Sequence, residues 1–135
     1  MDAIRLSRAD WQWMRDYVHL NLPEESCGIL GGMDGQIEAI LPVENSAHST
    51  ASFTMNPAQL IKALYYLKNQ SLDLVGMFHS HPQGPSYPSL TDILEFNYPG
   101  TMVMIWSRQF NEEWRAASYL IQDEKFSQIP MMLMD

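Results

Sequence analysis

Two histidines that are two residues apart, His79 and His81, are the first residues in this sequence whose type and spacing could do chemistry. They follow a compact apolar run, Leu72–Phe78, which predicts a buried strand. Because alternate side chains of a strand share one face, both imidazoles would point into the same site. A lone His-x-His pair is more often structural than functional, so its importance depends on its partners.

Asp92 is the candidate for a third ligand. It lies near the start of a predicted helix, and the loop before it contains Gly84 and three prolines, so the chain can turn tightly and bring the carboxylate back toward the histidines. Two imidazoles and one carboxylate would hold zinc and leave a fourth position open to water. Such a site lowers the pKa of water toward ~7 and so provides a hydroxide nucleophile at neutral pH.

Hydrolysis also needs a group that moves protons and a donor for the oxyanion. Glu25 lies just before an apolar strand and could carry a proton from water to the leaving amine, although Glu24 competes with it. Ser89 could donate a hydrogen bond to the oxyanion. Taken singly, Ser89 is an ordinary N-cap and Asp92 an ordinary acid of a first helical turn.

The elements that must position these residues alternate between helices and strands. Helices are predicted over residues 7–21, 57–69 and 90–98, and strands over 27–32, 36–43, 53–55, 72–78, 101–107 and 114–121, with a turn at 109–113 and a last strand or extended tail over 126–133. This order predicts an α+β or α/β layered domain, a mixed β-sheet flanked by helices.

Composition narrows the class of protein. The 135 residues predict a single domain over 1–135, and 46% hydrophobic with 18% charged residues is a globular balance. The net charge of −8 argues against a nucleic-acid partner. No stretch approaches the ~20 apolar residues of a membrane helix, and the N-terminus does not resemble a signal peptide, so we expect a cytoplasmic protein without a membrane partner.

The whole pattern resembles the JAMM (MPN+) zinc metalloprotease family, small prokaryotic type. Its signature is an upstream Glu, then His-[Ser/Thr]-His-Pro, then Ser-x-x-Asp, and here Glu25 is followed by His79-Ser80-His81-Pro82 and Ser89-Leu90-Thr91-Asp92, with seven residues between His81 and Ser89. The segment Pro23–Gly32 is similar to the Pro-x-Glu-x-Cys-Gly segment of the family, which favours Glu25 over Glu24. Val43-Glu44-Asn45, Phe53–Pro57 and Val75–Phe78 also resemble family segments, so the resemblance extends over residues 5–122.

The resemblance implies a cytidine-deaminase-like JAMM/MPN core with one Zn²⁺ per chain. His79, His81 and Asp92 would be the metal ligands, Glu25 the general acid/base and Ser89 the oxyanion stabiliser, while Ser80 would point away from the metal. The expected reaction is hydrolysis of the peptide or isopeptide bond after the C-terminal Gly-Gly of a ubiquitin-like or sulfur-carrier protein.

Two alternatives remain open at this point. One is a zinc hydrolase acting on another peptide, such as a cell-wall or phage-tail substrate. The other is a non-catalytic MPN partner-binding module, in which His19 or His48 could close the metal site. Cys27, the only cysteine, is expected to be a buried core residue, and the apolar segment Met131–Met134 could seal a homodimer. A zinc deaminase is disfavoured, because one cysteine cannot supply its Cys-x-x-Cys pair.

Overall fold

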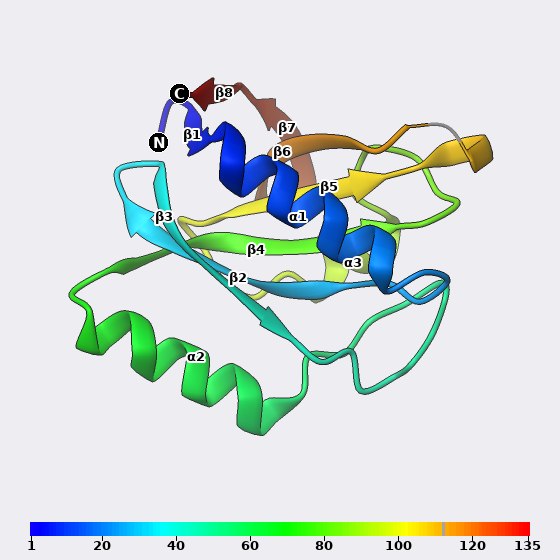
Figure 1. Ribbon diagram of the computed structural model, residues 1–135, viewed down its shortest axis with the longest axis horizontal. Helices are drawn as coiled ribbons and strands as arrows, with labels where there is room; N and C mark the ends of the chain where they lie inside the picture. Colours follow the sequence, from blue (N-terminus) through cyan, green and yellow to red (C-terminus); the bar gives the residue numbers. More distant parts are fainter. Residues whose placement is uncertain (112) are drawn as a thin grey trace.

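A mixed β-sheet with a helix on one face and two on the other forms the centre of the computed structural model, which describes residues 1–111 and 113–135 (Figure 1). The strands are β1 (Ile4–Ser7), β2 (Cys27–Met33), β3 (Gln36–Val43), β4 (Asp73–His81), β5 (Met102–Ser107), β6 (Arg115–Gln122), β7 (Lys125–Ile129) and β8 (Met131–Met134). The helices are α1 (Arg8–Leu20), α2 (Pro57–Asn69) and α3 (Leu90–Glu95), with a 3₁₀ turn at Gln109–Asn111. The α+β prediction of a mixed sheet flanked by helices is confirmed.

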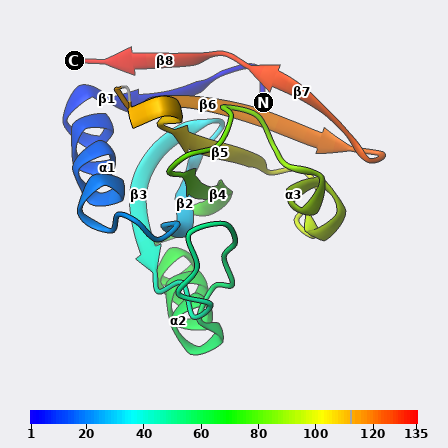
Figure 2. The same ribbon diagram turned by 90° about the vertical axis from the view of Figure 1, so that its right-hand side faces the viewer.

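The described strands form one sheet in the order β7-β6-β5-β4-β2-β3-β1-β8. Its central strand β4 pairs antiparallel with β2 and parallel with β5. The two edge strands, β7 and β8, follow one another in the chain with only Pro130 between them. The sheet must therefore curl until its edges approach each other, and Figure 2 shows β7 leading directly into β8.

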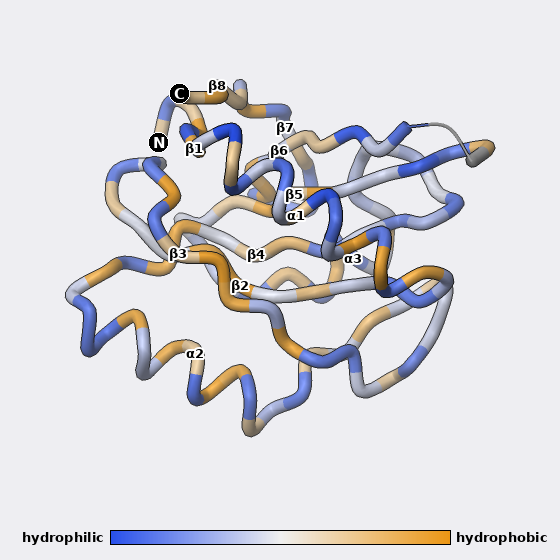
Figure 3. The backbone as a smooth tube through the Cα atoms, viewed as in Figure 1, coloured by the Kyte–Doolittle hydropathy of each residue, from blue (hydrophilic) through white to orange (hydrophobic). Residues whose placement is uncertain are grey.

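The two faces of the sheet carry different helices. On one face, Phe78 of β4 belongs to the same hydrophobic cluster as Met14 and Val18 of α1. On the other, Met77 packs with Ala63 and Leu67 of α2. Since Met77 and Phe78 are adjacent in one strand, their opposite directions follow from strand alternation. Figure 3 shows hydrophobic and hydrophilic residues alternating along α2, as expected for a helix with one buried face.

Local signals account for the helix boundaries. The Ser7 hydroxyl accepts a hydrogen bond from the Asp10 amide at 3.0 Å, and the Asn56 side chain accepts one from Gln59 at 3.1 Å. Pro57 occupies the first turn of α2, where its missing N–H costs nothing. The predicted helix over 57–69 is confirmed at both ends.

Three predicted elements were wrong in extent. Residues 53–55 form no strand but one isolated bridge, Asn45 to Met55, because the Thr54 amide donates to the Asn45 side chain instead. The helix predicted over 90–98 ends at Glu95, since Phe96 is extended and joins the cluster of Val103 and Ile105. The strand predicted over 72–78 begins at Asp73 and continues through His81.

Two further differences concern the sheet edges. The tail predicted over 126–133 is two strands, β7 and β8, and the edge pairing of β8 with the unpredicted strand β1 depends on residues far apart in sequence.

Of the turn predicted over 109–113, residues 109–111 form the 3₁₀ turn, and residue 112 lies outside the described residues. In the described part of the chain, no helix has the length and hydropathy needed to cross a bilayer.

Candidate metal centre

His79 and His81 lie at the carboxyl end of β4, on the face that carries α2 and α3. Both are buried, and their Nε2 atoms are 3.1 Å apart. The ring of Phe53 stacks on the imidazole of His79 at a centroid distance of 4.5 Å. Both imidazoles therefore lie on one face of the strand, as the spacing of the two histidines predicts. Their burial limits the directions in which the rings can turn.

The loop after β4 fixes the orientation of His81. Its Nδ1 lies 2.8 Å from the Pro85 carbonyl oxygen, which can only accept a hydrogen bond. Nδ1 therefore carries the proton, and Nε2 of the neutral ring keeps its lone pair for the site. Gly84 permits this turn, because a Cβ there would lie only 3.1 Å from the Cβ of His81.

Asp92, in the first turn of α3, completes the convergence. Its Oδ2 lies 3.0 Å from His79 Nε2 and 3.2 Å from His81 Nε2. The same oxygen accepts a hydrogen bond from the Ser89 amide at 2.8 Å, and the Ser89 hydroxyl accepts one from the Asp92 amide at 3.0 Å. This reciprocal capping box holds the carboxylate toward the histidines.

The donor set fits a metal ion. Two imidazole nitrogens and one carboxylate oxygen face a common point, and without a positive charge between them their lone pairs would repel each other. Complete burial lowers the pKa of His79 below its usual value, although Asp92 opposes that effect. Burial also acts to lower the pKa of His81, but the nearby Asp92 carboxylate and the Pro85 carbonyl outweigh it and raise that pKa. For Asp92, burial acts to raise the pKa, but the two histidines and the Ser89 amide hold it well below its usual range. A carboxylate and two imidazoles suit Zn²⁺ with an open position.

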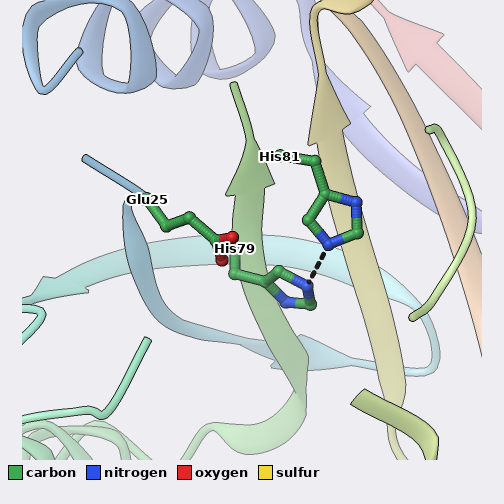
Figure 4. A group of neighbouring side chains, drawn as sticks. All are labelled: Glu25, His79 and His81. Atoms are coloured by element: carbon green, nitrogen blue, oxygen red, sulfur yellow. Dashed lines mark hydrogen bonds between the residues drawn. The ribbon is translucent and has the colours of Figure 1, made fainter. Parts of the chain in front are cut away.

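Glu25 lies beside this group, on the segment that leads into β2. Its carboxylate and the two imidazoles each offer a ligand atom, all within 4.8 Å of one another, and Figure 4 shows it directed toward the histidines. Burial raises the pKa of Glu25 to about 7, against the opposing attraction of His81. Glu24 points elsewhere, with its carboxylate 3.0 Å from His48 Nδ1.

A cavity of about 920 Å³ opens onto the site. One wall is formed by residues 50–54, which precede α2, and another by His81 and the residues 82–85 that follow β4. Glu25, Ser89 and Asp92 all line it. Four of the five predicted site residues, Glu25, His81, Ser89 and Asp92, therefore line one space that is large enough for an extended peptide segment, and His79 lines the neighbouring pocket together with Asp92.

Other residues that the sequence singled out lie outside this group. Ser80 turns to the opposite face, where its hydroxyl accepts a hydrogen bond from the Ser26 amide at 2.7 Å. His19 Nδ1 accepts a hydrogen bond from Trp114 Nε1 at 3.1 Å, so neither it nor His48 joins the site. Cys27 is buried with its Sγ 3.3 Å from the Val43 carbonyl oxygen, and burial raises the pKa of its thiol to about 12, as expected for a core residue.

Sequence reasoning did not assign three contacts of the site: the Pro85 carbonyl on His81, the Phe53 ring on His79, and the side chain of Asn45 on the Glu25 main chain. No sequence pattern predicts which backbone carbonyl will accept a hydrogen bond from a histidine. Asn45 lies in a polar segment of the kind that usually forms an exposed turn, yet it is buried. The reason is its hydrogen bonds to main-chain groups that the sequence alone does not bring together.

Comparisons with known proteins agree with this geometry. The family described as prokaryotic homologs of the JAB domain matches residues 8–119. A desampylase of Haloferax volcanii is 33% identical over 68% of this chain and 70% of its own length. A probable TtuB-protein conjugate cleaving protease of Thermus thermophilus is 36% identical over 60% of this chain, and that match spans about half of the relative, 55%.

More distant relatives cover more of the chain. A CysO-cysteine peptidase of Mycobacterium tuberculosis is 24% identical over 84% of this chain and 79% of its own. Among solved structures, a Desulfitobacterium hafniense protein superimposes with a TM-score of 0.87 at 26% identity, covering 98% of this chain and 93% of its own. A JAB1/MPN domain protein from Archaeoglobus fulgidus has a TM-score of 0.61 at 14% identity over 98% of this chain and 100% of its own, a likeness of fold.

Proposed function

The chain belongs to the family of prokaryotic homologs of the JAB domain, and from this membership and the site geometry we propose that it is a zinc-dependent peptidase acting after the C-terminal Gly-Gly of a ubiquitin-like or sulfur-carrier protein. The observation that carries the proposal is the convergence of His79, His81 and Asp92 on one point, with the Glu25 carboxylate beside it and a cavity in front.

His79, His81 and Asp92 would hold the zinc ion. Asp92 is preferred to Glu25 as the third ligand because its Oδ2 is within 3.2 Å of both imidazole nitrogens and is oriented by the Ser89 amide. When bound, zinc supplies a Lewis acid and lowers the pKa of water toward ~7. The orientation of His81 by the Pro85 carbonyl keeps its Nε2 available as a ligand.

Glu25 then has the role of moving the proton. Its carboxylate would accept a proton from the attacking water and deliver it to the nitrogen of the departing amine, so that the bond between carbonyl carbon and nitrogen breaks without releasing an amide anion. Its buried carboxylate, next to the histidines that would hold the metal, supports this role.

Ser89 would stabilise the oxygen of the attacked carbonyl. Its hydroxyl oxygen already accepts the Asp92 amide, which leaves the hydroxyl proton available to donate into the cavity that Ser89 lines. A fixed donor aimed at a developing oxyanion typically contributes ~10²–10³-fold in rate.

The relatives and the cavity together support the substrate class. The relatives are a desampylase, a CysO-cysteine peptidase and a probable protease of TtuB conjugates. In this chain, small residues line the cavity, among them Ala51 and Ser52 on one wall and Gly84 on the other. A Gly-Gly tail has no side chains and can lie extended between such walls.

The test uses sulfur-carrier and ubiquitin-like proteins with C-terminal extensions after Gly-Gly, incubated with the protein before and after chelation and after zinc is restored. We expect a cut after Gly-Gly that chelator abolishes and zinc restores. Glu25→Gln should bind zinc but cleave ~10²–10⁴-fold more slowly, whereas Asp92→Asn should lose zinc.

Three outcomes would overturn parts of this proposal. Loss of zinc in Glu25→Gln with retention in Asp92→Asn would exchange the two carboxylate roles. Hydrolysis of cell-wall peptides without any cut of Gly-Gly fusions would replace the substrate class. Zinc binding without hydrolysis of either would indicate a partner-binding module.

A further inference from the structure

Asn45 is a buried amide in the segment between β3 and α2, and it uses both ends of its side chain. It is 7% exposed. Its Nδ2 donates to the carbonyl oxygens of Glu25 and Ser52, each at 3.0 Å. Its Oδ1 accepts from the amides of Ala47 at 3.1 Å and Thr54 at 3.0 Å. One side chain thus satisfies four main-chain groups, which is its full capacity.

The main chain of Glu25 is held on both sides by this segment. Its carbonyl accepts from Asn45, and its amide donates to the Ser49 carbonyl at 2.9 Å. The next residue, Ser26, is held separately by the Ser80 hydroxyl of β4. The peptide between Glu25 and Ser26 is therefore held at its carbonyl by Asn45 and at its N–H by β4, while the Ser49 carbonyl holds the peptide that precedes Glu25.

The same segment also faces the metal centre. Residues 50–54 form a wall of the cavity, and Phe53 stacks on His79. Backbone pairs close the segment without help from Asn45: the Ser46 amide donates to Thr54 at 2.8 Å, and the Asn56 amide donates to Glu44 at 2.9 Å. Loss of the Asn45 side chain should consequently loosen the link to Glu25 without releasing the whole loop.

We propose that Asn45 is a positioning residue that sets the Glu25 carboxylate relative to the two histidines, and that it couples this position to the cavity wall at residues 50–54. The inference rests on the proposed function for its kinetic consequence. Asn45 does not line the cavity, and its four hydrogen bonds all go to main-chain groups. It acts through the Glu25 carbonyl, and a carboxylate displaced by about 1 Å can cost ~10²-fold in rate.

Two substitutions separate the two halves of this role. Asn45→Asp keeps an oxygen for the amides of Ala47 and Thr54 but removes both hydrogens that hold Glu25 and Ser52. We expect kcat to fall ~10–100-fold with little change in KM. Asn45→Ala also releases the Thr54 amide, the contact with the wall that Asn45→Asp keeps, so we expect KM to rise as well. Asn69→Ala, at the exposed end of α2, is the matched control and should change neither constant.

Amide hydrogen exchange tests the structural half without any activity. In zinc-loaded protein, Asn45→Asp should speed exchange of the Glu25 and Ser26 amides, which flank the carbonyl that Asn45 holds, while the Thr54 amide, whose acceptor oxygen is kept, stays protected. Unchanged exchange at Glu25 in both Asn45 variants would overturn the proposal, and so would equal acceleration at all three amides, since that would indicate general loosening.

A double-mutant cycle tests the kinetic half. If Asn45 acts through Glu25, the loss in kcat caused by Asn45→Asp should vanish in a Glu25→Gln background. An equal loss in both backgrounds would contradict the role. If the wild-type protein cleaves no Gly-Gly fusion, the proposed function fails. Amide hydrogen exchange still decides whether Asn45 holds the Glu25 main chain.

Discussion

The two faces of strand β4 show how one segment can serve both stability and chemistry. On one face, Phe78 packs in the core with α1, and Ser80 binds the Ser26 amide. On the other, His79 and His81 meet Asp92 at the edge of a cavity. Both faces are buried, yet the first is filled by protein, whereas on the second several polar atoms face one point. Burial with satisfied partners stabilises the fold, and burial with converging acceptors indicates a site for a cation.

The largest difference between the faces should appear when one residue of each face of β4 is replaced by alanine. His81→Ala removes one of the three proposed metal ligands, so we expect zinc to be lost. Activity should fall by more than the ~10–100-fold that is typical when a residue that only hydrogen-bonds to a metal ligand is replaced. Phe78→Ala should instead destabilise the protein by ~3–5 kcal/mol, with zinc still bound by the molecules that remain folded.

Zinc content and denaturant unfolding of both variants check this comparison. A His81→Ala protein that retains stoichiometric zinc, or a Phe78→Ala protein of unchanged stability, would show that the two faces are not divided in this way. Leu90→Ala, on the exposed side of α3, is a control that should alter neither quantity.

Ser89 lies on the histidine face of β4 and has two roles, the N-cap of α3 and the proposed donor to the oxyanion. A second substitution can separate these roles. Ser89→Ala removes both the cap of α3 and the proposed donor, so we expect ~10²-fold lower kcat and ~1 kcal/mol lower stability. Ser89→Gly removes the same hydroxyl but costs only a few tenths of a kcal/mol at an N-cap. Equal rates for the glycine variant and wild type, measured at saturating substrate, would exclude the oxyanion role.

Ser80 offers the smallest predicted effect on activity, although it lies between the two histidines. Ser80→Ala leaves the buried Ser26 amide without its acceptor, which should cost ~1–3 kcal/mol of unfolding free energy. Zinc content should not change, since the side chain points to the α1 face. Ser80→Thr keeps the hydroxyl and is the control, and zinc loss in Ser80→Ala would contradict the separation of faces.

Local patterns carried much of the fold. The caps Ser7 and Asn56 and the periodicity behind them placed α1 and α2, because these signals act within one turn of a helix. The edge strands were less predictable. Strand β1 is short, and its partner β8 lies more than a hundred residues away, so its pairing is a property of the closed sheet rather than of its own residues.

The sequence by itself determined the types of the candidate ligands and their order: the His-Ser-His alternation, the Ser-x-x-Asp turn and a preceding glutamate. Strand alternation is a local rule, so it also settled that Ser80 turns away from the histidines. The tertiary structure decided what depends on several elements meeting. It brought α3 back across the loop to aim Asp92 at the histidines, separated Glu25 from Glu24 by burial, and gave Asn45 its hold on the Glu25 main chain. The contacts of Asp92 with the histidines and of Asn45 with Glu25 join residues 11 to 20 positions apart, and no local preference of the chain encodes their distances.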